Sequence, residues 1–296
     1  LPPSHIPYLQ DTYESLLRQS FKDWEWVIGL NGGAELPEYL RGDPRVVSFF
    51  AGDDPDGKNK VGRLKKACCL RASGKILVEL DADDLLTPNA LETIQEAFDS
   101  KTDGVIVMAY SNCAEFWDKT WKPRVFSEYW GWRSRPFRYA DHDLVEMVAW
   151  PPNPQSFRRI EWAPDHVRAW HREAYIEIGG HDESLRFGDD HDLCCRMFVA
   201  FGADRIKHID ECLYVYRIHG SNNCVTKNDE VQAQVWLNQL KYTEPMAMRW
   251  ATDSGLLCLD LGGGINPKAG YATVDRNGGD VGADLDGLWP FKDDSV

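Results

Sequence analysis

Apolar strands alternate with helices between residues 11 and 110, and this alternation constrains the fold more than any other feature. Strand patterns occupy 24–30, 45–50, 75–80 and 104–110, and helical patterns occupy 11–21, 64–70 and 87–98. Strands joined through helices at this spacing run parallel, because each helix carries the chain back to the same edge of the sheet. The sequence therefore predicts an α/β fold with a doubly wound mixed sheet flanked by helices.

Acidic residues follow the buried strand at 75–80. Its sequence "KILVEL" runs directly into "DADD", so that Asp81 and Asp83 form a D-x-D at the carboxyl end of the strand. Ligands of doubly wound sheets bind at that end, and carboxylate oxygens suit hard divalent cations such as Mg²⁺ or Mn²⁺. An acidic helix cap is the structural alternative, but the position on the sheet favours a cation site for a diphosphate group.

A second acidic cluster and a histidine lie further along the chain. Asp189, Asp190 and Asp192 crowd the start of a predicted helix, where the helix dipole explains one carboxylate but not three. A carboxylate at this position could take a proton from a hydroxyl acceptor. His219 in "YRIHG" is either a metal ligand or an ordinary surface or core residue, and its spacing alone favours the second interpretation.

Tryptophans and arginines are concentrated between residues 116 and 172. The stretch "EYWGWRSRPFRY" at 128–139 is too rich in both for a core element, so we expect a loop that lines an acceptor cleft. Trp130 and Trp132 are its candidate acceptor contacts, because aromatic faces suit sugar rings, although any single tryptophan could instead fill the core. The formal net charge of −14 favours a glycan acceptor over nucleic acid.

Four motifs, taken in order, resemble the family 2 inverting glycosyltransferases of the GT-A fold over approximately residues 5–225. They are "YLQDTYESLLRQSFKDWEWVIGLNGG", "GRLKKACCLRASGKILVELDADD", "GGHDESLRFGDDHDL" and "YRIHG". The resemblance implies a metal-dependent enzyme that moves a sugar from a nucleotide-diphosphate donor to a hydroxyl of a glycan or related acceptor.

The resemblance also implies how the donor is held. Asp81 and Asp83 would bind Mn²⁺ or Mg²⁺ together with the diphosphate, and His219 would complete these contacts. Lys65 or Lys66 occupies the region in which the family often has an Arg-Asn pair, so a lysine contact to phosphate is expected.

On the acceptor side, the resemblance implies that Asp190 is the catalytic base. We also expect Asp189 to contact the acceptor, and Asp189 or Asp192 is the alternative base. Asn31 or Glu35 would replace the acidic turn that contacts the nucleobase in the family. The family's first strand is missing or reduced here, which favours a rival hypothesis: a noncatalytic sugar- or nucleic-acid-binding module on a degenerate GT-A fold. The intact carboxylates argue against that rival.

The C-terminal segment, beginning "LLCLDLGGG", resembles the opening of a class I S-adenosylmethionine-dependent methyltransferase, with Asp275 placed to bind ribose hydroxyls. We expect a glycosyltransferase domain at 1–228, a helical linker at 229–252 and the truncated, partial Rossmann-like start of a methyltransferase domain at 253–296. S-adenosylmethionine would be a cofactor only if that domain were complete.

The cysteines and the apolar runs predict the compartment. Eight cysteines are unevenly spaced and form no C-x-x-C, which is typical of reduced thiols in a cytosolic protein. No apolar run approaches the ~20 residues that span a bilayer, and no signal-peptide pattern is present. We therefore expect a cytoplasmic protein.

Overall fold

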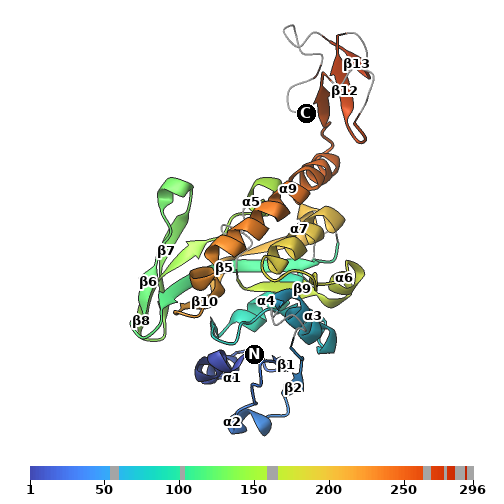
Figure 1. Ribbon diagram of the computed structural model, residues 1–296. Coiled ribbons are helices and arrows are strands. Elements are labelled where there is room, and N and C mark those ends of the chain that lie inside the picture. Colours follow the sequence, from blue (N-terminus) through green and yellow to red (C-terminus); the bar gives the residue numbers. More distant parts are fainter. Residues whose placement is uncertain are drawn as a thin grey trace.

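The computed structural model describes residues 1–53, 60–100, 104–158, 166–262, 268–276, 279–283 and 291, apart from the side chain of Trp130. Helices and strands form a mixed α/β body, and a long helix leads from it to a small C-terminal sheet (Figure 1).

The N-terminal part supplies a parallel two-stranded sheet with its covering helices. Its elements are η1 (Pro3–Tyr8), α1 (Leu9–Leu17), β1 (Trp26–Leu30), α2 (Glu38–Arg41), β2 (Val46–Phe50) and α3 (Val61–Arg71). β1 pairs with β2 in parallel, from Trp26 opposite Val46 to Leu30 opposite Phe50. The two strands form a sheet of their own, separate from the main sheet, whereas the sequence predicts one sheet.

The main sheet is mixed and lies at the centre of the body. It contains β3 (Ile76–Val78), β4 (Leu85–Leu86), β5 (Met108–Trp117), β6 (Lys122–Arg124), β7 (Arg133–Tyr139), β8 (His142–Val148), β9 (Arg168–His171) and β10 (Ile206–Ile218). Its central order is β3-β9-β5-β10-β4; β5 and β10 are parallel, and the other pairs are antiparallel. The predicted mixed sheet with flanking helices is thus confirmed.

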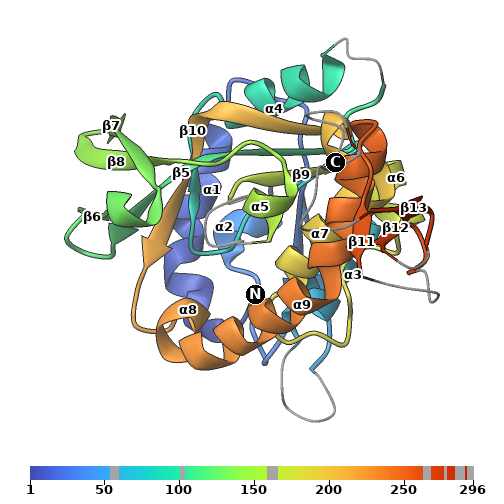
Figure 2. The ribbon, with the colours of Figure 1, turned by 90° about the horizontal axis from the view of Figure 1, so that it is seen from above.

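Strands β6, β7 and β8 project to one side of the body (Figure 2). β7 and β8 form a hairpin in register from Arg133 opposite Val148 to Tyr139 opposite His142. The expectation that residues 128–139 form a loop is therefore wrong, since they contain the short helix η2 (Glu128–Trp130) and strand β7. Arginines on β7 are tolerated because the strand lies at the sheet margin with much of its length exposed.

The remaining helices cover the sheet and connect its strands. They are α4 (Ala90–Asp99), α5 (Pro154–Phe157), α6 (Arg172–Glu177), α7 (Asp189–Phe201), η3 (Ala203–Arg205), α8 (Asn223–Thr226) and α9 (Asn228–Asp253). The largest core cluster joins α7 and α9 to the sheet through buried residues such as Trp170, Phe198 and Met246. Each such side chain contributes roughly 1.5–3 kcal/mol through burial of its apolar surface.

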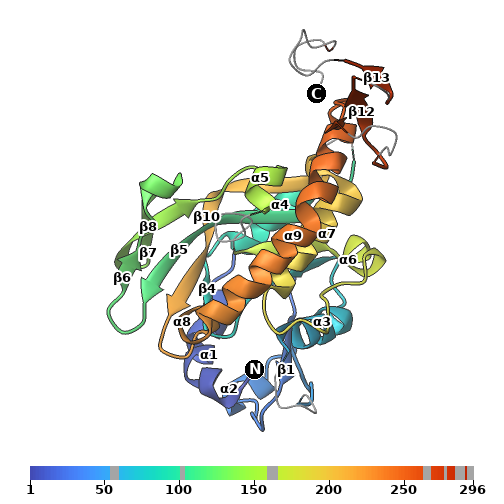
Figure 3. The same ribbon diagram turned by 45° about the horizontal axis from the view of Figure 1, so that its top comes forward.

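Helix α9 crosses the body from α8 to the C-terminal sheet (Figure 3). Tyr242 donates a 2.6 Å hydrogen bond to Asp192, and Asn238 donates one of 2.8 Å to the carbonyl of Gly188. These contacts attach the predicted linker to α7, so α9 packs as part of the body over much of its length. None of the described helices is long and apolar enough to cross a membrane.

In the described part of the chain after α9, short parallel strands form a sheet: β11 (Leu259–Leu261), β12 (Ala272–Asp275) and β13 (Val281–Gly282). Their parallel pairing agrees with a partial Rossmann-like segment. Most of the glycine turn, residues 263–267, lies outside the described residues. The boundaries at 228 and 252 stay predictions.

Candidate functional site

The D-x-D lies in the turn between β3 and β4, at the carboxyl end of β3. Asp83 is buried with 4% of its surface exposed, and its Oδ2 is 2.8 Å from Nε2 of His219 at the end of β10. The structure therefore brings together two of the three predicted metal ligands. Asp81, the third, points elsewhere: its side chain is 39% exposed and 3.8 Å from Nζ of Lys65.

A histidine that the sequence analysis did not select joins Asp83 and His219. Nε2 of His5, in η1, lies 3.9 Å from Oδ2 of Asp83. The candidate ligand atoms of His5, Asp83 and His219 all lie within 4.8 Å of one another. Nitrogen and carboxylate oxygen donors are ligands that suit a divalent metal ion. Asp81 is not one of these donors, so its metal role stays a prediction.

Asp84 anchors the turn that carries Asp83. Its carboxylate accepts hydrogen bonds of 2.7 Å from the Tyr214 hydroxyl and from the backbone N–H of Arg217. Arg217 also donates through Nε to the carbonyl oxygen of Asp83 at 2.8 Å. Burial raises the pKa of Asp84 well above its usual range, with a further increase from Asp83 and Asp81. Asp84 is thus a structural residue of the turn.

Glu79, at the end of β3, is the centre of a buried ion-pair network. Its carboxylate lies 2.6 Å from Nε of Arg168, 2.9 Å from Nε2 of His181 and 3.3 Å from Nζ of Lys65. Burial acts to raise the pKa of Glu79, but Lys65 and Arg168 outweigh it and hold the pKa well below its usual range. Glu79 therefore holds two cations at the edge of the site.

Asp190 lies at the start of α7, where Arg168 reaches it from β9. The Nη2 of Arg168 is 2.9 Å from Oδ2 of Asp190, whose side chain is 27% exposed. Burial acts to raise the pKa of Asp190, but Arg168 and Lys65 outweigh it and lower the pKa to about 2. Asp190 is therefore an ionised carboxylate that an incoming hydroxyl could reach.

Two glycines permit this geometry. Gly188 precedes α7 with φ of 64°, a left-handed conformation that favours glycine. Gly62 lets α3 approach the segment before α7, because a Cβ at this position would lie 2.2 Å from the carbonyl oxygen of Asp182. The close approach brings Lys65 of α3 toward Asp189 and Asp81.

Asp189, the predicted acceptor contact, is a buried residue. It is 3% exposed, and its Oδ2 lies 3.8 Å from Nε2 of His181. Burial raises the pKa of Asp189 to about 6, and the attraction of Lys65 only partly opposes this increase. A buried carboxyl of this kind cannot meet an acceptor without rearrangement, so the structure counts against the prediction.

The raised pKa of Asp189 has a measurable consequence. Because the folded pKa of about 6 exceeds the unfolded value of about 4, Asp189 stabilises the fold below pH 4 and loses this contribution as pH rises through 6. We expect Asp189→Asn to raise the free energy of unfolding by up to about 3 kcal/mol above pH 6 and little below pH 4. Urea denaturation across this range measures the difference, and a variant less stable at pH 8 than the wild type would contradict it.

The two candidate lysines have different surroundings. Lys65 contacts Glu79 and Asp81, whereas Nζ of Lys66 lies 3.0 Å from the carboxylate of Glu183. The carboxylates outweigh burial and raise the pKa of Lys65 well above its usual range, so Lys65 is cationic. Of the two predicted phosphate contacts, the geometry favours Lys65. Asn31, at the end of β1, is 1% exposed, and its nucleobase role stays a prediction.

The predicted acceptor tryptophans are not on an open loop. Trp132 is 3% exposed and stacks on Phe126 with ring centroids 4.9 Å apart, so its predicted contact with an acceptor is not supported. The side chain of Trp130 lies outside the described residues. Core packing, the alternative interpretation, is correct for Trp132.

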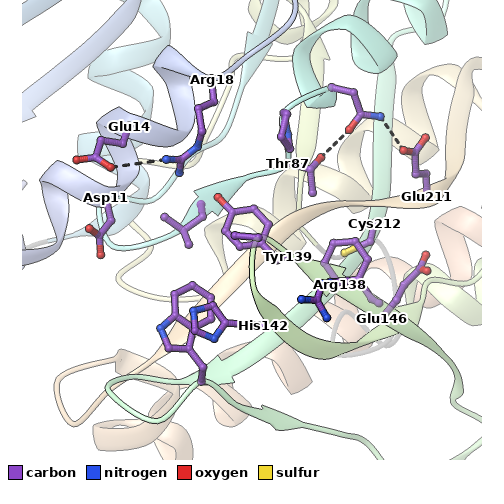
Figure 4. A pocket seen from close by; sticks show the side chains of 16 residues that line it. Asp11, Glu14, Arg18, Thr87, Arg138, Tyr139, His142, Glu146, Glu211 and Cys212 are labelled. Atoms are coloured by element: carbon purple, nitrogen blue, oxygen red, sulfur yellow. Dashed lines mark hydrogen bonds and ion pairs between the residues drawn. The ribbon is translucent and has the colours of Figure 1, made fainter.

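A cavity of about 890 Å³ instead lies between α1, β4 and the β7–β8 hairpin (Figure 4). Trp121, Tyr139 and His142 contribute to its lining, and Trp121 stacks on His142 with ring centroids 3.9 Å apart. Asp11 lines the cavity and also lies 2.8 Å from Nη2 of Arg217, whose Nε contacts the carbonyl of Asp83. Asp11 and Arg217 therefore link the cavity to the candidate ligands His5, Asp83 and His219, which we call the metal-ligand cluster.

Comparison with known proteins agrees with this arrangement. Residues 5–151 match the family described as Glycosyl transferase family 2. The match covers just under half of the chain and contains the D-x-D. No curated protein sequence matches the chain.

Solved structures extend the comparison to the fold. Residues 1–349 of TarS from S. aureus share 11% identity with the chain, which covers 73% of that structure at a TM-score of 0.53, using 90% of its own length. The same TarS fragment in complex with UDP shares 12% identity, with 86% and 69% coverage and a TM-score of 0.53. At this identity the likeness shows the GT-A fold alone. The comparisons give no support to the methyltransferase resemblance.

Sequence analysis missed His5, Arg168 and the ion-pair role of Glu79. A charged residue within each of the apolar strands "ILVEL" and "VRAWH" was an available signal, because a buried charge requires a partner. His5 carried no comparable signal.

Proposed function

We propose that the protein is a metal-dependent, inverting glycosyltransferase that moves a sugar from a nucleotide-diphosphate donor to a hydroxyl of a glycan or related acceptor. One observation carries the proposal: charged contacts connect the D-x-D to Asp190. They run from Asp81 to Lys65 at 3.8 Å, to Glu79 at 3.3 Å, to Arg168 at 2.6 Å and to Asp190 at 2.9 Å. Groups for an anionic donor and a carboxylate base thus occupy one continuous site.

In this proposal Asp190 accepts the proton of the acceptor hydroxyl while the hydroxyl oxygen attacks the anomeric carbon. The bond from that carbon to the diphosphate oxygen breaks, and the nucleoside diphosphate leaves with the electron pair. Attack opposite the leaving group inverts the anomeric configuration. Arg168 holds the carboxylate of Asp190 in place and keeps it ionised.

The donor half of the site would bind the diphosphate leaving group. A divalent cation such as Mn²⁺ or Mg²⁺, held by Asp83 and His219, would neutralise the charge that develops on the diphosphate. Lys65 supplies a second positive charge close to Asp81. The UDP bound to the structurally similar TarS fragment supports a nucleoside-diphosphate donor.

A glycan acceptor is favoured by charge and by the cavity lining. Trp121, Tyr139 and His142 offer ring surface in the cavity, and a net charge of −14 opposes nucleic acid binding. All eight cysteines are free thiols, which supports the proposed cytoplasmic location. S-adenosylmethionine would require a complete methyltransferase domain.

Hydrolysis of nucleotide sugars tests the proposed function. We expect slow release of nucleoside diphosphate from the correct donor in the presence of Mn²⁺ and its loss with a chelator. A thermal scan of donors identifies the substrate first, because ligand at 100 times its Kd stabilises the fold by about 2.7 kcal/mol. Stabilisation by a sugar or nucleotide without any turnover would support the rival hypothesis of a noncatalytic binding module.

A further inference from the structure

Three parts of the chain that are far apart in sequence meet at the metal-ligand cluster. His5 comes from η1, Asp83 from the turn after β3 and His219 from the end of β10. Their donor atoms lie within 4.8 Å of one another, with Asp83 and His219 buried and His5 partly buried. Metal–ligand bonds of about 2.0–2.2 Å place two ligands of one ion at most about 4.4 Å apart. A small movement of η1 would therefore bring His5 within bonding distance of an ion held by Asp83 and His219.

Aromatic contacts hold η1 against His219. The ring of Tyr8 stacks on the imidazole of His219 with centroids 4.5 Å apart and an interplanar angle of 19°. The ring of His5 meets the same imidazole edge-on at 5.7 Å. His5 and Tyr8 both belong to η1, so one short helix covers His219 and also supplies the additional imidazole.

The second nitrogen of His219 has a partner that orients the ring. Its Nδ1 lies 2.9 Å from Oγ of Ser221, which leaves Nε2 directed at Asp83. Metal-binding histidines generally use the other ring nitrogen in this way, because the outer contact fixes the ring and its tautomer. The same pattern would be unnecessary for a histidine that only fills space.

Asp83 differs from the other site carboxylates in its partners. Glu79 and Asp190 each contact the guanidinium of Arg168. Among the described residues, the side chains of His5, His219 and Asn222 contact the carboxylate of Asp83 instead. A carboxylate that contacts imidazole and amide groups can exchange a hydrogen bond for a metal bond, whereas a buried arginine pair would oppose that exchange.

We propose that His5 is a protein ligand of the donor-site metal, so that the ion is held by two imidazoles and one carboxylate. Mg²⁺ prefers oxygen ligands in octahedral geometry and keeps several waters, whereas imidazole suits later transition metals. The site therefore selects Mn²⁺, Co²⁺ or Zn²⁺ over Mg²⁺. This inference rests on the proposed function, because it assigns a further ligand to its metal.

Binding of Co²⁺ to the full chain without donor tests the assignment. Calorimetry measures its affinity, and the visible absorption of bound Co²⁺ reports the ligand set independently of activity. We expect His5→Gln to weaken Co²⁺ binding by about tenfold or more, as loss of a metal-site contact does. Ser4→Ala, an exposed change in the same helix, should bind Co²⁺ as the wild type does.

A second variant tests the selectivity. His5→Asp replaces the imidazole by an oxygen ligand, and we expect it to lower the ratio of Co²⁺ affinity to Mg²⁺ affinity by about tenfold or more relative to the wild type. Thermal unfolding of each metal-free variant, compared with that of the metal-free wild type, tests whether the fold is retained. An unchanged ratio would overturn the proposed selectivity.

The outcomes separate this inference from the proposed function. If Asp83→Asn abolishes Co²⁺ binding but His5→Gln leaves its affinity and spectrum unchanged, the His5 assignment is wrong and the proposed enzyme stands. If the wild type binds no divalent ion, both the His5 assignment and the metal dependence fall. Weaker Co²⁺ binding and an altered Co²⁺ spectrum in His5→Gln, with neither change in Ser4→Ala, would support the assignment.

Discussion

Asp190→Asn is expected to lower kcat for sugar transfer by about a hundredfold or more, the scale of lost general-base catalysis. The amide keeps the size of the carboxylate but cannot take up the acceptor proton. Donor affinity should stay near the wild-type value, because the contacts proposed for the diphosphate come from Asp83, His219 and Lys65. Steady-state kinetics, with donor binding measured separately, test both parts.

Asp192→Asn is the matched control, since it changes a carboxylate on the same helical turn. Asp192 faces Arg196 at 2.7 Å and the hydroxyl of Tyr242 at 2.6 Å. This variant should lose stability while the folded fraction keeps its kcat. A nearly unchanged kcat in Asp190→Asn would remove Asp190 from the role of base, and loss of donor binding would assign it to the donor side.

Arg168→Met is expected to have the largest effect on stability. Arg168 is 2% exposed and contacts both Glu79 and Asp190. Removal of one partner from a buried ion pair typically costs about 3–5 kcal/mol, because the remaining charge is left buried. Lys65 and His181 still face Glu79, so we expect a loss of about 3 kcal/mol at pH 7.

The loss should depend on pH. In the wild type the pKa of Glu79 is held well below its usual range, so its stabilising contribution is present at neutral pH and disappears as pH falls through the folded pKa. Without Arg168 the carboxylates can take up protons at higher pH, so the deficit should shrink toward pH 4. Urea denaturation at pH 7 and pH 4 measures this change.

Arg138→Met provides the control for Arg168→Met. Arg138 pairs with Asp143 at 2.8 Å, but the two side chains are 61% and 85% exposed. Exposed pairs contribute about 0–1 kcal/mol, so this variant should unfold near the wild-type denaturant concentration at both pH values. If both substitutions lowered the free energy of unfolding equally, burial of the Arg168 ion pairs would not increase their contribution to stability.

Features encoded by neighbouring residues were predictable from the sequence alone. The apolar run at 75–80 and the acidic residues that follow it identify a buried strand with carboxylates at its end. The acidic start of α7 was equally visible, and with it Asp190. Such features are local, because side-chain periodicity and helix-terminal preferences depend on positions a few residues apart.

The local pattern was misleading at 128–139. The stretch "RSRPFRY" carries arginines and aromatic residues that an exposed strand can accommodate, but the density of these residues suggested a loop. Pairing with β8 decides the matter, since the hairpin provides backbone partners for β7. Trp132, just before β7, stacks on Phe126. The sequence does not contain that pairing in any single segment.

Only the tertiary structure decides which charged and metal-binding groups meet. His5 and His219 reach Asp83 from positions far apart in the sequence, and Arg168 reaches Glu79 from a strand 89 residues away. Strand order places Arg168 and His219, because β9 pairs with β3 and β10 ends beside the turn that carries Asp83. Packing of η1 on His219 places His5. The residue types of the site are thus determined by sequence, but their partners, burial and ionisation follow from how the strands pair and how η1 packs on them.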